Sequence, residues 1–217
     1  MLVAAVSAVI VIGLFWLGWD FILLPALAGF LVAGPVLAIG LYEKSRKLMA
    51  GQTASVTQMI LVRPASGGQV LFAGALLMTL MLLWTRAAVL IYVLFLGVQA
   101  FPGFADIAPM LFRTVTGWSI IAVGSAVGAL FAAFAFAISL FSIPMLLDRR
   151  TDALTAMGSS VALVWHNLPV ALAWGAIVAG LSVLSLATGL VGLIVVFPLL
   201  GHGTWHAWRA VQGGVVA

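Results

Sequence analysis

Cysteine is missing from this 217-residue chain, and charged side chains are scarce. Without cysteine there is no disulfide, no thiolate metal ligand and no cysteine nucleophile. Asp, Glu, Lys and Arg make up 6% of the residues, against roughly 25% in a soluble domain, and 65% of the residues are hydrophobic. So few charges cannot cover a water-soluble surface. We therefore predict an all-α fold, a polytopic membrane helical bundle.

Strand-like alternation of apolar and polar residues is also missing, since runs such as ALLMTLMLLW are apolar almost throughout. The first residues lack a basic start and a small-residue cleavage site, so we expect a spanning helix there and not a secretory signal. The formal net charge of +4 is better explained by loops on the inner face of a membrane than by nucleic acid, which we do not expect as a partner.

Six apolar segments are long enough to cross a hydrocarbon layer of about 30 Å. We treat residues 1–217 as a single integral membrane domain of three similar hairpins, at about 1–43, 69–147 and 169–209. The third and fourth segments are longer than needed, so they must tilt, project from the membrane or break near their outer ends. The six segments cover residues 2–18, 23–42, 69–98, 114–146, 169–186 and 188–208.

The second, fourth and sixth segments end alike. Each has a proline (Pro35, Pro144 or Pro198), then a short apolar stretch, then polar or charged residues. A proline inside a helix frees a carbonyl group and kinks the helix. Such a repeat arises by duplication either with or without a role in transport. The connections after the second and fourth segments also match, and each is predicted to hold a short helix on the inner membrane surface.

Basic residues favour one side of this arrangement. The positive-inside rule therefore predicts an inner-membrane protein with both termini in the cytoplasm.

Small residues four apart predict helix contacts at Gly124, Gly128, Ala132, Ala135 and Ser139, and at Ala171, Gly175 and Ala179. Trp165, Trp205 and Trp208 are expected to anchor the chain at the inner interface.

Three stretches carry a family resemblance: GFLVAGPVLAIGLYEKSR, ISLFSIPMLLDRRTDALTAMGSS and GLIVVFPLLGHGTWHAWRAV. They resemble a bacterial family of predicted integral membrane proteins that is named only as a domain of unknown function. The resemblance implies a six-helix inner-membrane protein and brings no established activity. Family members usually have a longer polar region before the first span, so this chain resembles a short or a trimmed member.

Some members of that family carry a label resembling cytochrome c oxidase subunit I. This chain has three histidines, too few to ligate two haems and a copper ion. It also has half the spans of such a subunit. It therefore cannot be a catalytic oxidase subunit, although it could be a small accessory partner of such a complex.

His202 and His206 lie four residues apart, which on a helix places them on one face about 6 Å apart. A metal site would need a third or fourth ligand, which only Glu43, Asp148 or Asp152 could supply at that face. One helix cannot hold haem with both, because axial ligands approach iron from opposite sides. We expect a polar pair suited to a helix C-terminus, and no metal or other cofactor.

Arg86 is the most unusual residue, because it places a charge inside the apolar run LLWTRAAVLIYVLF. A charge near the bilayer centre costs several kcal/mol. Arg86 should therefore either extend to the outer interface or pair with an acid, and our hypothesis is a pair with Asp20 or Asp106, both on the outer side. The pair is interpreted either as a structural bridge between hairpins or as a binding group for an anionic ligand.

Catalytic motifs such as GxSxG, a P-loop or HExxH are missing. We expect a non-catalytic membrane protein of structural or accessory role, in contact with the lipid bilayer and with a membrane-protein partner or a second copy. The alternative is a small-solute transporter or channel with a site near Arg86. An enzyme acting on lipid is a third hypothesis.

Overall fold

The structure is a computed structural model, which describes residues 8–9, 12–13, 16–17, 34–98, 104–188 and 191–212, without the side chains of 104–106, 108 and 186. Within these residues all regular structure is helical, which confirms the all-α prediction. The helices are α3 (Ile39–Met49), α4 (Val56–Ile60), α5 (Gly67–Leu96), α6 (Phe104–Arg113), α7 (Val115–Ser139), α8 (Ser142–Asp148), α9 (Ala153–His166), α10 (Leu168–Ala187) and α11 (Leu193–Gln212).

Three stretches of the described chain are long and apolar enough to cross a membrane, at Gly67–Leu96, Val115–Asp148 and Leu168–Ser185. They match the predicted segments that begin at residues 69, 114 and 169. The segment at 2–18 and most of 23–42 fall outside the described residues, and the segment at 188–208 corresponds to α11, which is not among these three stretches. The six spans and the three similar hairpins therefore stay a prediction.

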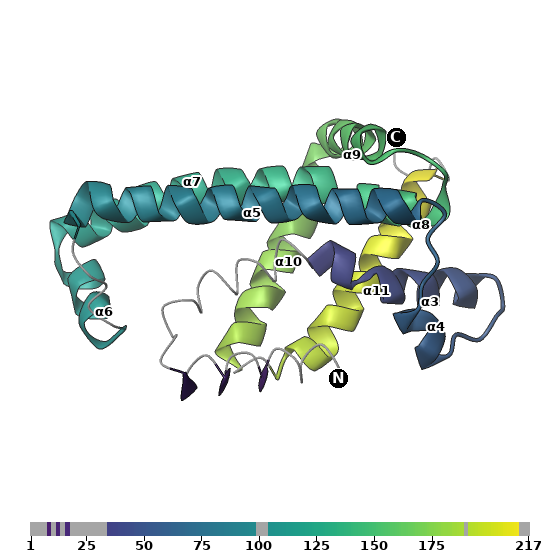
Figure 1. The fold of residues 1–217 in the computed structure, drawn as a ribbon, viewed down its shortest axis with the longest axis horizontal. Coiled ribbons are helices and arrows are strands. Elements are labelled where there is room, and N and C mark those ends of the chain that lie inside the picture. The colour runs from purple at the N-terminus through teal and green to yellow at the C-terminus, as the bar shows by residue number, and fades with distance from the viewer. Residues whose placement is uncertain are drawn as a thin grey trace.

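Helices α5 and α7 lie side by side along the longest axis of the molecule (Figure 1). Helix α6 packs against α7 at one end of this pair, and α8 and α9 lie at the other end. Helices α10 and α11 run next to each other, across the direction of α5 and α7 in this view. The short α3 packs along α11 and carries α4 with it.

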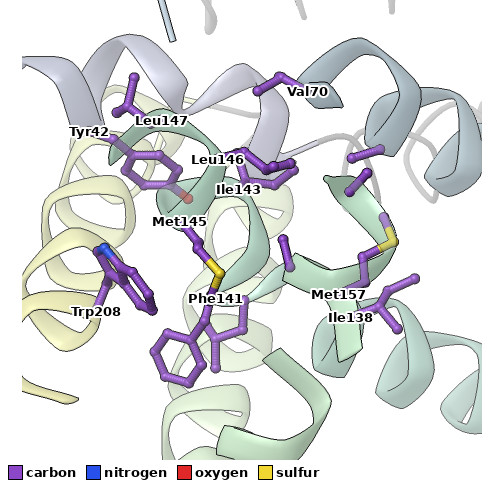
Figure 2. Close-up of a cluster of buried hydrophobic side chains, with 14 of the residues drawn as sticks. Tyr42, Val70, Ile138, Phe141, Ile143, Met145, Leu146, Leu147, Met157 and Trp208 are labelled. Carbon is purple, nitrogen blue, oxygen red and sulfur yellow. The ribbon is translucent and has the colours of Figure 1, made fainter. Parts of the chain in front are cut away.

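The buried core lies at one end of the molecule, centred on α8. Residues 142–147 of α8 are all buried, and α3, α5, α9 and α11 surround them. Figure 2 shows Ile143, Leu146 and Leu147 of α8 near Tyr42 and Val70. We call this region the packed end; it comprises α3, α8, α9 and residues 67–77, 135–141 and 201–212. The rest of α5 and α7, residues 78–96 and 115–134, is called the membrane arm.

A break separates α7 from α8 at Leu140 and Phe141. Pro144 has no N–H to donate to the carbonyl of Leu140, four residues earlier. The hydroxyl of Ser160 on α9 stands inside the helical ladder: it accepts from the backbone N–H of Phe141 at 3.0 Å and donates to the carbonyl of Ala137 at 2.7 Å. A side chain inserted in this way bends a helix. The break thus lies at the packed end, whereas a break near the outer end had been one expectation for this long segment.

The two connections at the packed end are joined by hydrogen bonds. The hydroxyl of Ser66, just before α5, donates to the carbonyl of Arg149 at 3.0 Å and accepts from the N–H of Thr151 at 2.9 Å. The side chain of Gln69 accepts from the N–H of Ala153 at 2.9 Å. These contacts fix the start of α5 against the loop that leads into α9.

The two short helices predicted in these connections are present as α4 and α9, and their place on the inner membrane surface stays a prediction. Helix α4 begins with a capping box between Ser55 and Gln58, which satisfies N–H groups that would otherwise lack acceptors. Helix α9 buries one face against α7 and α8, at Ala153, Ala156, Met157, Ser160 and Val164.

Two of the predicted interface anchors occupy a different environment. Trp205 is 1% exposed and Trp208 is 2% exposed, because the rings pack against Tyr42 of α3 and Phe141 beside α8. The anchor prediction is therefore wrong for these two residues. Trp165 on α9 is exposed, as an anchor would be.

The predicted small-residue stripes make contacts at some of their positions. Gly128 of α7 faces the ring of Trp84 on α5, and Gly175 of α10 faces Phe136 of α7. A methyl group added at Gly124 would meet no atom within 4 Å, so its expected contact is not present within the described residues. The contacts at Gly201 and Gly203, which face Leu41 and Trp174, were not predicted.

Candidate functional site

Arg86 lies in the membrane arm, on the side of α5 that faces away from α7. Trp84, two residues earlier, packs against Phe131 of α7 with ring centroids 5.8 Å apart. Each residue of an α-helix turns the chain by about 100°, so Arg86 projects from nearly the opposite side. Its side chain is exposed.

Apolar residues surround Arg86 on this side of α5. Leu82 and Leu90, one turn before and one turn after it, are 59% and 69% exposed. Leu83 and Val89 are exposed as well. We call these five residues, Leu82, Leu83, Arg86, Val89 and Leu90, the open face of α5. The face is a single cation in an uncovered apolar surface.

The predicted carboxylate partners of Arg86 fall outside what the structure describes. Asp20 is not among the described residues, and Asp106 is described in α6 without its side chain. Of the ion pairs between described residues, two join Glu43 to Arg46 and Lys47 and one joins Asp148 to Arg209. Arg86 takes part in none of these three. Its pairing with Asp20 or Asp106 stays a prediction.

His202 and His206 lie on the second half of α11 in different surroundings. His202 faces α3, where its Nδ1 lies 2.6 Å from the hydroxyl of Ser45. His206 is exposed. Among the described residues there is no group of three or more His, Cys, Asp or Glu side chains that could hold a metal ion. The contact of His202 therefore joins two helices.

The Ser45–His202 distance is within the range of an activated serine nucleophile. We therefore compare a catalytic role for this pair with a structural one. A nucleophile must reach its substrate, and Ser45 is only 2% exposed. No described side chain other than Ser45 is hydrogen-bonded to the ring of His202, whereas a catalytic histidine is usually oriented by a third group. The geometry suits a structural hydrogen bond between α3 and α11.

The polar contacts of α3 form a second feature that sequence reasoning did not find. Tyr42 is buried, and its ring stacks on Trp205 of α11. Glu43 is buried and forms an ion pair with Arg46 at 2.7 Å. The signal in the sequence was the spacing of Tyr42 and Ser45, which three residues apart share one face of a helix.

The C-terminal part of α11 joins the end of α8. Asp148 lies 3.7 Å from Arg209 and accepts a hydrogen bond from Gln212 at 3.5 Å. The guanidinium of Arg149 lies over the ring of Trp208, 5.5 Å from its centroid. These charges therefore hold helices together at the packed end, and none of them lines a described reaction site.

Comparison with known proteins gives one match. Residues 23–148 match a family described as predicted integral membrane proteins of type DUF2189, which is a domain of unknown function. The matched region runs from before α3 to the last residue of α8. Neither the curated proteins nor the solved structures contain a significant match.

Proposed function

The chain belongs to this family of integral membrane proteins, and from that premise we propose that it is a non-catalytic structural or accessory component of a membrane complex. The observation that carries the proposal is the contrast between its two ends. The packed end has a closed core around α8, whereas the membrane arm exposes most of its apolar side chains. A closed packed end with an exposed apolar membrane arm suits a protein that acts by contacting other membrane components.

The non-catalytic part of the proposal is supported by the placement of the polar groups. The one serine that contacts a histidine within the described residues, Ser45, is buried. Glu43, Arg46 and Lys47 of α3 and Asp148 of α8 are used in contacts between or within helices. Transport is the alternative, and it would need Arg86 to line an enclosed path. Arg86 instead lies on the open face of α5, so the accessory role is favoured.

We further propose that the packed end lies in the cytoplasm of a bacterial cell and that both termini are on that side. Most Lys and Arg residues lie at or next to the packed end, as the positive-inside rule requires of a cytoplasmic face. These are Lys44, Arg46, Lys47, Arg63, Arg149, Arg150 and Arg209. The chain has no cysteine, so a single Gln52→Cys variant, labelled from either side of sealed cells, tests the orientation directly.

Purification from the native membrane tests the accessory role. The full chain is extracted in a mild detergent, the co-purifying proteins are quantified, and a visible absorption spectrum is recorded. A stoichiometric membrane-protein partner without a Soret band is the expected result. A chain that purifies alone and conducts a solute after reconstitution into vesicles would overturn the proposal, and loss of that flux in Arg86→Gln would identify the transport site.

A further inference from the structure

Helices α3 and α4 lie at one border of the molecule (Figure 1) and expose a group of apolar side chains there. Helix α4 packs on α3, where the backbone of Met59 approaches Gly40. The side chains outside this contact are 52–72% exposed. We call the following five residues the apolar edge: Leu48, Met49, Val56, Ile60 and Leu61.

The apolar edge is held in a fixed shape by polar contacts. The capping box between Ser55 and Gln58 sets the start of α4. The ammonium group of Lys47 on α3 donates to the side-chain oxygen of Gln58 at 2.9 Å, which joins the two helices. The exposed apolar residues therefore belong to an ordered surface, and an exposed apolar patch with a polar rim is typical of an interaction site.

The exposed charge next to the apolar edge is positive. Residues 43–63 contain four Lys and Arg but a single carboxylate. That carboxylate, Glu43, is buried and paired with Arg46 and Lys47. Arg63, which follows α4, is exposed and takes part in none of the ion pairs between described residues. The surface that complements this region is therefore anionic as well as apolar.

The membrane is an anionic surface within reach of Arg63. Four residues after it, at most about 15 Å of chain, Gly67 begins α5, one of the stretches long and apolar enough to cross a bilayer. Acidic phospholipids attract basic segments next to a span. Apolar side chains of a surface helix enter the boundary between headgroups and acyl chains. A lipid surface thus matches both the charge and the apolar residues, whereas an acidic protein surface would match the charge alone.

We propose that the apolar edge and Arg63 together bind the anionic phospholipids of the membrane in which the chain lies. The apolar side chains enter the headgroup boundary, and the guanidinium of Arg63 contacts lipid phosphates. Acidic lipid is then a ligand of this chain as well as its solvent. The inference goes beyond the accessory function and does not depend on a protein partner.

A fluorescent label at Thr57 tests the docking. Thr57 is exposed on α4 beside Val56 and one turn before Leu61, so labelling Thr57→Cys leaves the apolar edge unchanged, and the chain has no other cysteine. The full chain is reconstituted into phosphatidylcholine vesicles, with or without phosphatidylglycerol as about one third of the lipid. We expect quenching by a lipid spin-labelled near its headgroup to rise about twofold or more with phosphatidylglycerol, and to fall at high salt.

The matching connection supplies the control position. Thr155 of α9 is exposed and follows the exposed Leu154, as Thr57 follows Val56. Residues 148–152, just before α9, contain two Asp and two Arg, so their charges balance. The same label in Thr155→Cys should therefore be quenched equally in the two lipid mixtures.

Variants of the Thr57-labelled chain separate the charge from the apolar contact. Fluorescence lifetimes give the ratio of lipid-contacting to water-exposed label. Arg63→Gln should lower this ratio about fivefold in phosphatidylglycerol vesicles, the effect of one basic residue near an anionic surface, while Arg63→Lys should retain it. Leu61→Ser should lower the ratio without a change of charge. Unchanged circular dichroism would show that these exposed substitutions leave the fold intact.

Three results would overturn the inference. The first is a Thr57 label that the lipid quencher does not reach in either mixture; quenching by aqueous iodide would then place the apolar edge in water, and protection from iodide would show that protein covers it. The second is equal quenching with and without phosphatidylglycerol, and the third is a ratio unchanged in Arg63→Gln. The accessory function fails on a different result, the absence of any co-purifying protein, which leaves the lipid site standing.

Discussion

The packed end and the membrane arm contain similar apolar residues, but the side chains are buried in the first and largely exposed in the second. In the packed end, Ile143, Leu146 and Leu147 are fully enclosed, and polar side chains close the gaps between helices. In the arm, α5 and α7 meet along one side only, and leucines such as Leu82 remain exposed. In the orientation proposed above, the packed end lies next to water, where burial of apolar surface drives packing. In lipid this driving force is lost, and contact depends on close fit and on polar groups.

The comparison accounts for where the polar contacts lie. The arm's hydroxyl groups return to the carbonyl group of the preceding turn, as Thr79, Thr85 and Ser119 do. Ser160 in the packed end and Ser66 next to it connect different segments of the chain, whereas Ser142 donates to the carbonyl of Ile138, four residues earlier. The packed end should therefore carry most of the stability of the described structure, and the following substitutions test that division.

The largest effect is expected from tryptophan truncation. Trp208→Ala removes a buried ring that contacts Phe141 and Arg149, and should lower the free energy of unfolding by about 3–5 kcal/mol. Trp118→Ala, its matched control in the arm, removes a ring that is 57% exposed and should cost far less. Both are measured by denaturant unfolding in micelles with near-UV circular dichroism. Equal losses of unfolding free energy would contradict the conclusion that the packed end carries most of the stability.

Removing the serine hydroxyl at the helix break should have the next largest effect. Ser160→Ala leaves the N–H of Phe141 and the carbonyl of Ala137 without their shared partner in a buried site. We expect a loss of about 1–3 kcal/mol. Ser119→Ala serves as the control, because the hydroxyl of Ser119 contacts only its own helix. If thermal unfolding of the two variants coincides, the hydroxyl of Ser160 does not stabilise the break.

A methyl group added at a glycine gives a smaller contrast. In Gly201→Ala the new carbon would lie 2.6 Å from the side chain of Leu41, which must shift at a cost of about 1 kcal/mol. In Gly124→Ala the methyl meets nothing within 4 Å, so stability should be unchanged or slightly higher. We expect a lower unfolding midpoint for Gly201→Ala than for Gly124→Ala. The reverse order would show that α3 and α11 approach less closely.

The smallest effect is a pH dependence at the start of α9. The N–H of Thr155 donates to Asp152 at 2.8 Å, which lowers the pKa of that carboxyl below its ordinary value of 3.8. A lowered folded-state pKa adds stability above the ordinary value, and this stability is lost as the pH falls through the folded-state pKa. Asp152→Asn, which keeps a capping side chain, should flatten this acid-side loss in midpoints measured from about pH 6 to pH 3. An identical slope in both proteins would contradict the assignment.

The long apolar helices could be predicted from the sequence because length and hydropathy decide them. The expected segment 69–98 became α5, and 169–186 became α10, with ends that differ by one or two residues. The short helices α4 and α9 were also predicted, because both connections have a Thr after an apolar residue, at Val56-Thr57 and Leu154-Thr155, followed by a short amphipathic stretch. Local signals sufficed for these elements.

The packed end could not be predicted in the same way, because its contacts join residues far apart in the chain. Trp205 and Trp208 have the sequence pattern of interface anchors, and they become core residues only because Tyr42 of α3 packs on Trp205 and Phe141 packs on Trp208. Pro144 indicated a kink, but the hydroxyl that completes it comes from Ser160 on the next helix. Likewise Arg86 stood out as a costly charge, whereas its direction relative to α7 required the Trp84 contact.

The hydroxyl of Ser160 also has a consequence for fragments of the protein. The region that matches the family ends at Asp148, and a fragment trimmed to that boundary would keep Pro144 while lacking the serine that closes the ladder. Its last helix would also lose the covering surface of α9 and α11. Expression of the family-matched region alone should therefore yield an insoluble or rapidly degraded product, and useful truncations should retain the chain through Gln212.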